Sequence, residues 1–127
     1  MTYYEQEVER IRREYLPCED ILERCRMARR IMDAECCSGI ELDELCRRLY
    51  VSKFHFIRQF SRCYGRTPHR YLTERRMQTA REFLGIGLTV AETCSRVGFT
   101  SVTSFVVLFK RFNRYTPSQY RQMRNFR

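Results

Sequence analysis

The sequence predicts an all-α protein, and three observations support this prediction. Apolar residues recur every three to four positions along most of the chain, strand-like alternation is absent, and the breaks fall at Pro or Gly. A two-helix unit is also repeated within the chain. With 127 residues, 43% of them hydrophobic, the chain can bury one modest core or two small cores that share a helix.

The first three helices follow from apolar spacing. A pattern over residues 8–16 predicts a short helix that stops before Pro17, because the residue before a proline disfavours helical geometry. A second amphipathic pattern covers residues 21–36 and closes at Gly39. A third pattern, of about two turns, covers residues 42–49.

The later helices are marked by their end signals. Ser52 is a suitable N-cap for a helix that ends before Gly65, since a serine hydroxyl accepts a hydrogen bond from a free amide of the first turn. Thr-Pro pairs open the helices expected over residues 68–84 and from residue 117 onward. Thr89 caps a helix over residues 90–97, and the turn at Gly98–Ser101 leads into a helix over residues 102–112.

Two stretches of the chain match each other in order. Residues 42–48 match residues 90–96 at a shift of 48, and after one extra residue the shift becomes 49. At the second shift the matched pairs are Phe56 and Phe105, Phe60 and Phe109, Arg62 and Arg111, Thr67 and Thr116, Pro68 and Pro117, and Tyr71 and Tyr120. A short helix, a tight turn, a second helix and a Thr-Pro helix start form the plan of a helix-turn-helix. A repeated αα-hairpin with no role in DNA binding would give the same matches.

The repeat predicts two units with the plan of a helix-turn-helix, and the expected helix over residues 68–84 lies between them in the sequence. We expect an N-terminal helical extension or linker over residues 1–25, a first subdomain over 26–67, the linker helix over 68–87 and a second subdomain over 88–127. The extension is expected to be a helix packed on the domain, with a dimer contact or a disordered tail as alternatives.

The charge of the chain is uneven. Its 24 Lys and Arg outnumber its 15 Asp and Glu, for a formal charge of +9, and residues 37–127 carry a net +11 while residues 1–36 carry −2. Such a field favours a polyanionic partner. Nucleic acid is the leading candidate, and an anionic membrane surface or an acidic protein is the alternative.

Several function classes are disfavoured. The sequence has no His/Asp/Cys constellation, no Gly-rich phosphate loop and no paired carboxylates in an apolar setting, so we expect neither an enzyme nor a cofactor. The N-terminal segment is mostly charged rather than signal-like, and the longest apolar run, Phe105–Phe109, is too short to cross a bilayer. We therefore expect a cytoplasmic protein without a membrane partner.

The seven cysteines favour packing over a metal site or a disulfide framework. No CxxC pair is present, and neither histidine has a cysteine at a ligand-like spacing, so no metal is expected. Cys25, Cys46 and Cys94 fall at apolar helical positions and are expected in the core. A redox-sensing role for the adjacent Cys36 and Cys37 is the alternative.

Four stretches of the chain carry a specific pattern. They are LDELCRRLYVSKFHFIRQFSRCYGRTPHRYL, RRMQTAREFL, TVAETCSRVGF and SFVVLFKRFNRYTPSQYR. Over about residues 26–124 they resemble the DNA-binding domain of the AraC/XylS transcription regulators. The resemblance implies two helix-turn-helix subdomains that are joined by a long linker helix, roughly Pro68 to Leu84. Their second helices enter successive major grooves of double-stranded DNA. It also implies an activator that contacts RNA polymerase, and an effector domain upstream if the chain is a fragment.

The resemblance assigns roles in the first recognition helix. Phe56 and Phe60 are expected to hold the helix to its scaffold, and Arg58 is the strongest candidate for base readout because its forked donors can bond guanine O6 and N7 together. The residues expected to face bases are Phe54, Ile57, Arg58 and Ser61. The residues expected to contact phosphates are Ser52, Lys53, His55 and Arg62.

The second recognition helix departs from the family pattern. The residues expected to face bases are Val102, Thr103, Val106 and Val107. The residues expected to contact phosphates are Ser101, Lys110, Arg111 and Arg114. The base-facing residues of this second helix have few hydrogen-bonding groups. We therefore expect the first recognition helix to carry most of the specificity and the second to add affinity. Arg114 stands where the family has glycine, so either Arg114 or Asn113 is expected to adopt a left-handed conformation. A protein-interaction module that has lost DNA binding in this half is the alternative.

Overall fold

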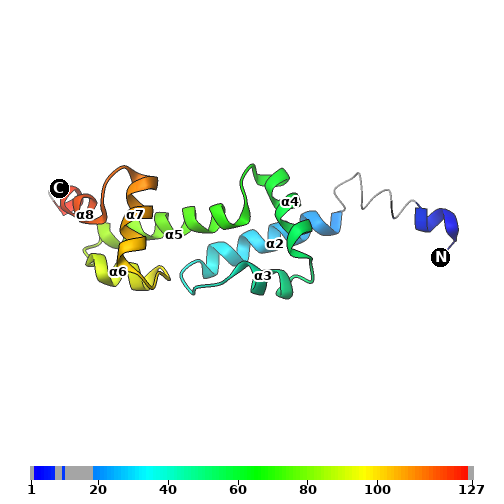
Figure 1. Ribbon diagram of the computed structural model, residues 1–127, viewed down its shortest axis with the longest axis horizontal. Coiled ribbons are helices and arrows are strands. Elements are labelled where there is room, and N and C mark those ends of the chain that lie inside the picture. Colours follow the sequence, from blue (N-terminus) through cyan, green and yellow to red (C-terminus); the bar gives the residue numbers. More distant parts are fainter. Residues whose placement is uncertain (1, 8–9, 11–18, 126–127) are drawn as a thin grey trace. The chain divides into compact units, whose positions relative to one another are not determined.

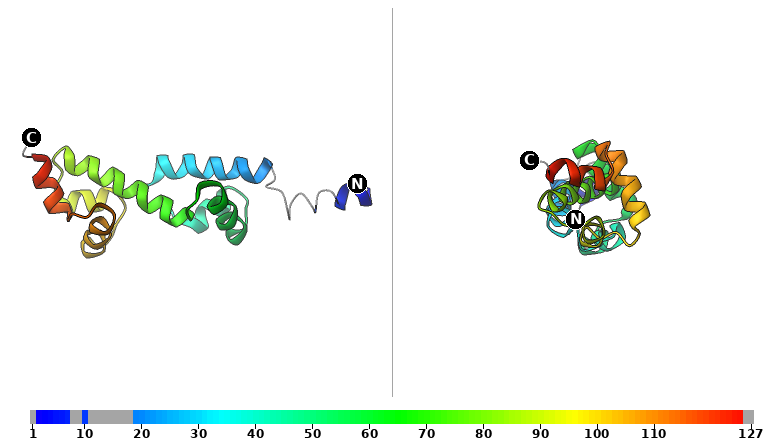
Figure 2. Two further views of the ribbon diagram at one scale, coloured as in Figure 1. Left: turned by 90° about the horizontal axis from the view of Figure 1, so that it is seen from above. Right: turned by 90° about the vertical axis from the view of Figure 1, so that its left-hand side faces the viewer.

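The computed structural model describes residues 2–7, 10 and 19–125, and the secondary structure of this part is helical, without strands (Figure 1, Figure 2). The labelled helices are α2 (Glu19–Glu35), α3 (Leu42–Arg48), α4 (Lys53–Tyr64), α5 (Pro68–Gly85), α6 (Val90–Arg96), α7 (Val102–Asn113) and α8 (Pro117–Asn125). The all-α prediction is confirmed, and the expected ends of α2 to α7 and the start of α8 lie within one or two residues of those observed. The helix expected over residues 8–16 lies, except for residue 10, outside the described residues.

The chain divides into two compact units. Unit 1 combines the chain up to Arg30 with Leu42–Pro68, and unit 2 combines Ile31–Glu41 with His69–Arg127. Residues 31–41, which the sequence division had included in the first subdomain, therefore belong to unit 2. The linker helix α5, apart from its first residue, also belongs to unit 2.

The internal repeat has a structural counterpart in each unit. α4 and α7 each have twelve residues. Their first turns are capped by Ser52, whose hydroxyl accepts from the His55 amide at 3.3 Å, and by Ser101, which accepts from the Ser104 amide at 3.3 Å. These hydroxyls satisfy amides that have no partner within the helix.

Paired phenylalanines anchor the two repeated helices. The ring centroids of Phe56 and Phe60 lie 5.6 Å apart, and those of Phe105 and Phe109 lie 5.8 Å apart. All four side chains are fully buried. A buried ring pair at a spacing of four residues fixes the rotation of its helix, since turning the helix would expose both rings.

The two units differ in where they place glycine. Each has a left-handed residue in the helix-turn-helix turn and another at the end of its recognition helix. The turn residue is Tyr50 (φ 55°) in unit 1 and Gly98 (φ 89°) in unit 2, whereas the helix end is Gly65 (φ 70°) in unit 1 and Arg114 (φ 69°) in unit 2. Each unit thus has one strained non-glycine residue, because a Cβ is disfavoured in this region.

The left-handed residue expected at Arg114 or Asn113 is Arg114. Asn113 remains helical and donates its side-chain amide to the Phe109 carbonyl at 3.1 Å, while its side-chain oxygen accepts from Arg81 at 2.6 Å. These two hydrogen bonds hold Asn113 in place, so the chain turns one residue later.

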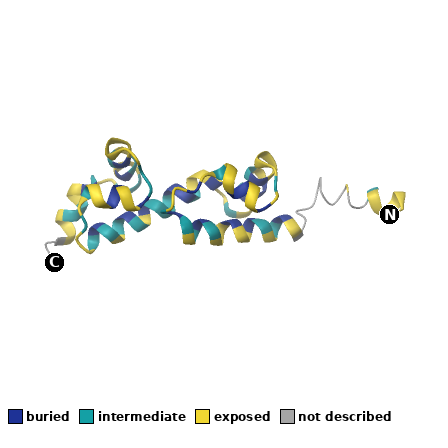
Figure 3. Ribbon diagram, turned by 90° about the horizontal axis from the view of Figure 1, so that it is seen from below, coloured by how far each residue is buried: buried dark blue, intermediate teal, exposed yellow. Residues whose placement is uncertain are grey.

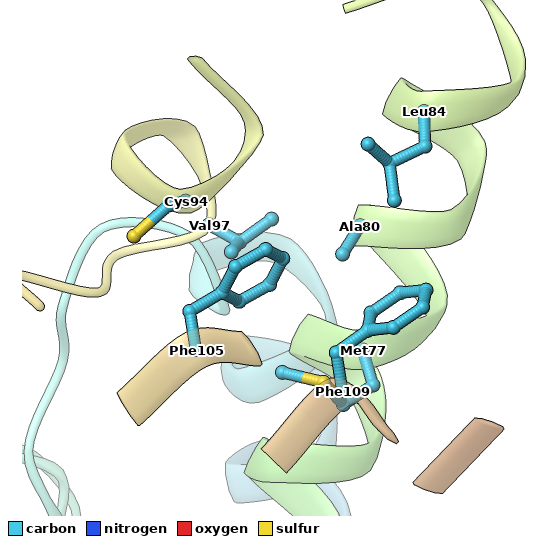
Figure 4. Packing of buried hydrophobic residues seen from close by; sticks show 7 residues of the cluster. All are labelled: Met77, Ala80, Leu84, Cys94, Val97, Phe105 and Phe109. Atoms are coloured by element: carbon cyan, nitrogen blue, oxygen red, sulfur yellow. The ribbon is translucent and has the colours of Figure 1, made fainter. Parts of the chain in front are cut away.

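The core of unit 2 is built from α5, α6, α7 and the turn after α6. Figure 4 shows the α5 side chains pointing toward those of the helix-turn-helix. The buried residues of this cluster are Met77, Ala80, Leu84, Cys94, Val97, Phe105 and Phe109. α5 thus serves as the scaffold against which the second helix-turn-helix is packed.

Unit 1 is packed in a similar way by α2, α3 and α4. Its buried apolar residues include Ile21, Cys25, Ala28, Leu45, Cys46, Leu49, Phe56 and Phe60. The Arg29 guanidinium lies 5.2 Å from the ring centroid of Tyr64, and Arg24 donates to the Tyr50 carbonyl at 3.0 Å. Buried and exposed residues alternate around the helices, as expected for amphipathic elements (Figure 3).

Polar contacts attach the end of α2 to α5 within unit 2. The Tyr71 hydroxyl donates to Asp33 Oδ1 at 2.6 Å, and Arg75 Nε forms an ion pair with the same oxygen at 3.1 Å. Arg76 donates to the carbonyl oxygens of Cys36 at 2.7 Å and Ile40 at 3.3 Å. The turn that follows α2 is therefore held by a side chain of α5.

Replacing Arg114 with glycine tests the backbone strain at the end of α7. Arg114→Gly is expected to be more stable than Arg114→Ala by roughly 1 kcal/mol, because both lose the charge and only glycine removes the Cβ. Denaturant unfolding of the two variants measures the difference. An alanine variant as stable as the glycine variant would show that the left-handed residue carries no such strain.

Candidate nucleic-acid interface

The buried ring pair of α4 leaves a defined outward face. Phe54, two residues before the first buried ring, has 82% of its surface exposed, and Arg58, two residues after it, is also exposed. Arg58 forms no ion pair or hydrogen bond within the described part of the chain. Its five guanidinium donors are therefore free to bond an external partner.

Two other expected base contacts are less available. Ile57 and Ser61 are half-buried, and the Ser61 hydroxyl donates to the Ile57 carbonyl at 2.7 Å. Since that hydrogen bond uses the only proton of the hydroxyl, Ser61 can act toward a partner only as an acceptor.

The expected phosphate contacts of α4 lie at the surface. Ser52, Lys53, His55 and Arg62 are all exposed. Lys53 Nζ also lies 3.1 Å from Asp43 Oδ1, and both side chains are at least half exposed. An exposed pair of this kind contributes little to stability, so a phosphate can compete with Asp43 for the lysine.

The outward face of α7 is apolar. Val102 is 47% exposed, Val107 is 54% exposed, Thr103 is exposed and Val106 is half-buried. Ser101 is exposed and caps the helix. Beyond this face, Lys110, Arg111 and Arg114 are exposed cations that make no ion pair among the described residues. α7 therefore combines an apolar face with a cationic C-terminal end.

The comparisons with known proteins agree with this arrangement. A family model described as "Helix-turn-helix domain" matches residues 45–123, more than half of the chain, and solved structures of AraC-type DNA-binding domains share its fold. The chain belongs to the AraC/XylS family. The family and its fold are those of DNA-binding transcription regulators, not of enzymes.

Three similar proteins illustrate the relationship. The regulatory protein PocR of Salmonella typhimurium is 27% identical over 101 residues, which are 79% of this chain and 33% of PocR. The C-terminal domain of AraT, a response regulator from Geobacillus stearothermophilus, is similar in structure, with a TM-score of 0.75 and 29% sequence identity. The match covers 80% of this chain and 85% of the AraT domain. The DNA-binding domain of AdpA, solved in complex with a target DNA, has a TM-score of 0.69 at 24% identity, covering 81% and 90%, which shows a shared fold.

This AraC/XylS domain spans about a third of PocR and about half of a Pseudoalteromonas carrageenovora relative.

No helix of the described residues is long and apolar enough to cross a membrane. Within the same residues no three His, Cys, Asp or Glu side chains gather as metal ligands. Cys25, Cys46 and Cys94 are buried as expected, and burial raises the pKa of each thiol, that of Cys25 to about 11.

Sequence reasoning missed one cationic group of this AraC/XylS domain. A cavity of about 350 Å³ in unit 2 is lined by His69, Arg70, Thr73, Leu108, Arg111 and Phe112. His69 and Arg70 lie in the first turn of α5, and Arg70 Nε lies 3.1 Å from Glu74 Oε1. The sequence does contain a feature that could have identified them. The first turn after Thr67-Pro68 is basic, whereas acidic residues are usual there because they complement the helix dipole.

A matched pair of substitutions tests the two faces of α4. Phe56→Ala is expected to lower the free energy of unfolding by about 3–5 kcal/mol, because it empties a fully buried site. Phe54→Ala is expected to change it by less than about 0.5 kcal/mol, since that ring is 82% exposed. Denaturant unfolding measures both variants, and similar losses in the two would place Phe54 in the core instead.

Proposed function

We propose that this AraC/XylS domain binds an asymmetric duplex site with α4 and α7 in successive major grooves, roughly 34 Å apart. In this proposal α4 supplies most of the base readout, and α7 supplies affinity and position. The observation that carries it is the Arg58 guanidinium, which is exposed and has no ion pair among the described residues.

Arg58 suits base readout for a geometric reason. The buried Phe56 and Phe60 flank it along the helix and fix the side to which it projects. A guanidinium that meets guanine O6 and N7 together provides roughly 1–3 kcal/mol of discrimination against another base. Phe54, with most of its ring exposed, is available for apolar contact with a thymine methyl or a sugar.

α7 suits a different role because its outward face offers few hydrogen bonds. Val102 and Val107 can contact thymine methyls, and only Thr103 adds a hydroxyl among the expected base contacts. Lys110, Arg111 and Arg114 can neutralise phosphates, which fix register without distinguishing sequences. The two helices are therefore expected to contribute unequally to specificity.

Site selection from a random DNA pool tests this division of roles. Arg58→Ala is expected to relax preference at one guanine by roughly 1–3 kcal/mol. Val107→Ala serves as the matched variant on α7, and it is expected to weaken binding while relaxing base preference less than Arg58→Ala does, because its contacts with thymine methyls involve no hydrogen bonds. If Val107→Ala relaxed base preference more than Arg58→Ala, the assignment of readout to α4 would be wrong.

A protein-interaction module on the same fold is the second candidate function, and the nearly donor-free face of α7 is the observation that favours it. Salt dependence separates the two functions. The five fixed cations expected at phosphates, Lys53, Arg62, Lys110, Arg111 and Arg114, give a slope of log affinity against log salt of about −4 to −5. An apolar protein contact would give a slope near zero.

Variants that each lack one positive charge test which residues contribute to this slope, with the affinity for duplex DNA measured by fluorescence anisotropy at several salt concentrations. Lys110→Gln is expected to reduce the slope by about 0.9, because one fewer phosphate is neutralised. Arg26→Gln is the control, since Arg26 is an exposed residue of α2 that pairs with Glu23 at 3.5 Å. Equal changes in the two variants would indicate a general charge effect rather than a contact made by α7.

Activation through contact with RNA polymerase is the regulatory output that we propose, on the basis of the family resemblance. Transcription in vitro from a promoter carrying a selected site, with and without the protein, separates activation from repression. A fall in transcript would contradict activation.

A further inference from the structure

Two adjacent thiols lie in contact in the turn after α2. The Sγ atoms of Cys36 and Cys37 are 3.5 Å apart, and Cys36 Sγ lies 3.8 Å from the Thr79 hydroxyl of α5. DNA binding assigns no role to this pair. All of these residues belong to unit 2.

The backbone that carries the two thiols is held on both sides. Arg76 donates to the Cys36 carbonyl at 2.7 Å and to the Ile40 carbonyl at 3.3 Å. The Gly98 backbone also packs against this turn, since a Cβ there would be in contact with the Cys37 carbonyl oxygen, 3.4 Å away. A ligand that needs both sulfurs would therefore find them already in place, which lowers the entropy cost of binding.

The pair is accessible from one side. Cys37 is half-buried and lines a cavity of about 610 Å³, whose wall also includes Cys94, Phe99 and Val102. Cys36 is only 5% exposed, and its Sγ lies 3.5 Å from that of Cys37. A reagent would therefore reach Cys37 first. If the reagent carries a small hydrophobic group, that group can contact the apolar side chains of the cavity.

The protonation state of the pair selects among thiol reagents. Burial, reinforced by the hydrogen bond with Cys36, raises the pKa of Cys37 to about 11. The thiol form therefore predominates at pH 7. Peroxides and divalent metal ions both require the thiolate, so both are disfavoured. A reagent whose oxygen leaves as water together with the thiol protons avoids this penalty, because its net reaction releases no proton.

We propose that Cys36 and Cys37 form a chelating dithiol site for monosubstituted trivalent arsenicals. In the reaction, two As–S bonds form while the As=O bond and both S–H bonds break. The oxygen leaves as water with the two thiol protons, and arsenic remains trivalent, so no oxidant or reductant is required. The organic group on arsenic lies in the cavity beside Phe99 and Val102.

A second pair of neighbouring thiols, Cys25 and Cys63, could also bind an arsenical and must be removed from the experiment. Cys25 of α2 is buried, and its pKa is raised by burial and by the neighbouring Cys63 of α4. Cys63 is exposed, so serine at this position removes that pair at little cost to packing. The Cys63→Ser protein is therefore the reference for the experiment.

The probe is phenylarsine oxide, and the readout is intact-protein mass in the presence of excess glutathione. The Cys63→Ser protein is expected to keep one phenylarsenic group per chain, which 2,3-dimercaptopropanol removes, because a chelate outcompetes a monothiol but not another dithiol. Adding Cys37→Ser is expected to reduce the retained arsenic at least tenfold. Equal retention in both proteins, or none in the reference, would overturn the proposal.

A second measurement needs no substitution at the site. In the unsubstituted protein, phenylarsine oxide is expected to protect Cys36 and Cys37 together from alkylation by iodoacetamide after unfolding, as mapped on peptides. Alkylation of both residues to the level of untreated protein would overturn the proposal even if Cys37→Ser impaired folding. Circular dichroism of the variants monitors that folding directly.

Discussion

The geometry of each candidate recognition helix depends on a pair of buried phenylalanine rings four residues apart. Phe56 and Phe60 in α4, and Phe105 and Phe109 in α7, are fully buried, with nearly equal centroid separations. A pair of large rings at this spacing allows one rotation of the helix about its axis. That rotation decides which residues are left for a partner: Phe54 and Arg58 in one unit, Val102 and Val107 in the other. The outward faces are therefore consequences of the core.

The same scaffold supports two chemically different faces. In α4 the outward face carries a guanidinium that has no partner among the described residues, whereas in α7 it carries valines followed by exposed cations. Hydrogen-bond donors distinguish bases, and fixed charges respond to the phosphate backbone of any sequence. A domain with one face of each kind can separate recognition from affinity. The conservation of geometry between the units, with different surface residues, is what an internal duplication followed by divergence of the exposed positions would produce.

The two units also share their local strain but distribute it differently. Each needs two left-handed residues, one in the turn and one at the helix end, and each has glycine at only one of them. In unit 2 the turn residue is Gly98, whose φ of 89° is disfavoured for residues with a Cβ, and its backbone packs against the turn after α2. In unit 1 that position is Tyr50, whose carbonyl is bonded to Arg24 instead.

The sequence by itself determined the helices from α2 onward, the capping residues of α4, α6 and α7, the repeat and the inward-facing phenylalanines. These features depend on neighbours within about four residues, and periodicity and end signals report such neighbours directly. The tertiary structure alone decided that residues 31–41 belong to unit 2, that Asn113 is held helical by Arg81, that Lys53 is paired with Asp43, and that His69 and Arg70 line a cavity with Arg111. Each of these involves residues separated by ten or more positions or by several helices, and no local pattern encodes which distant side chains will meet.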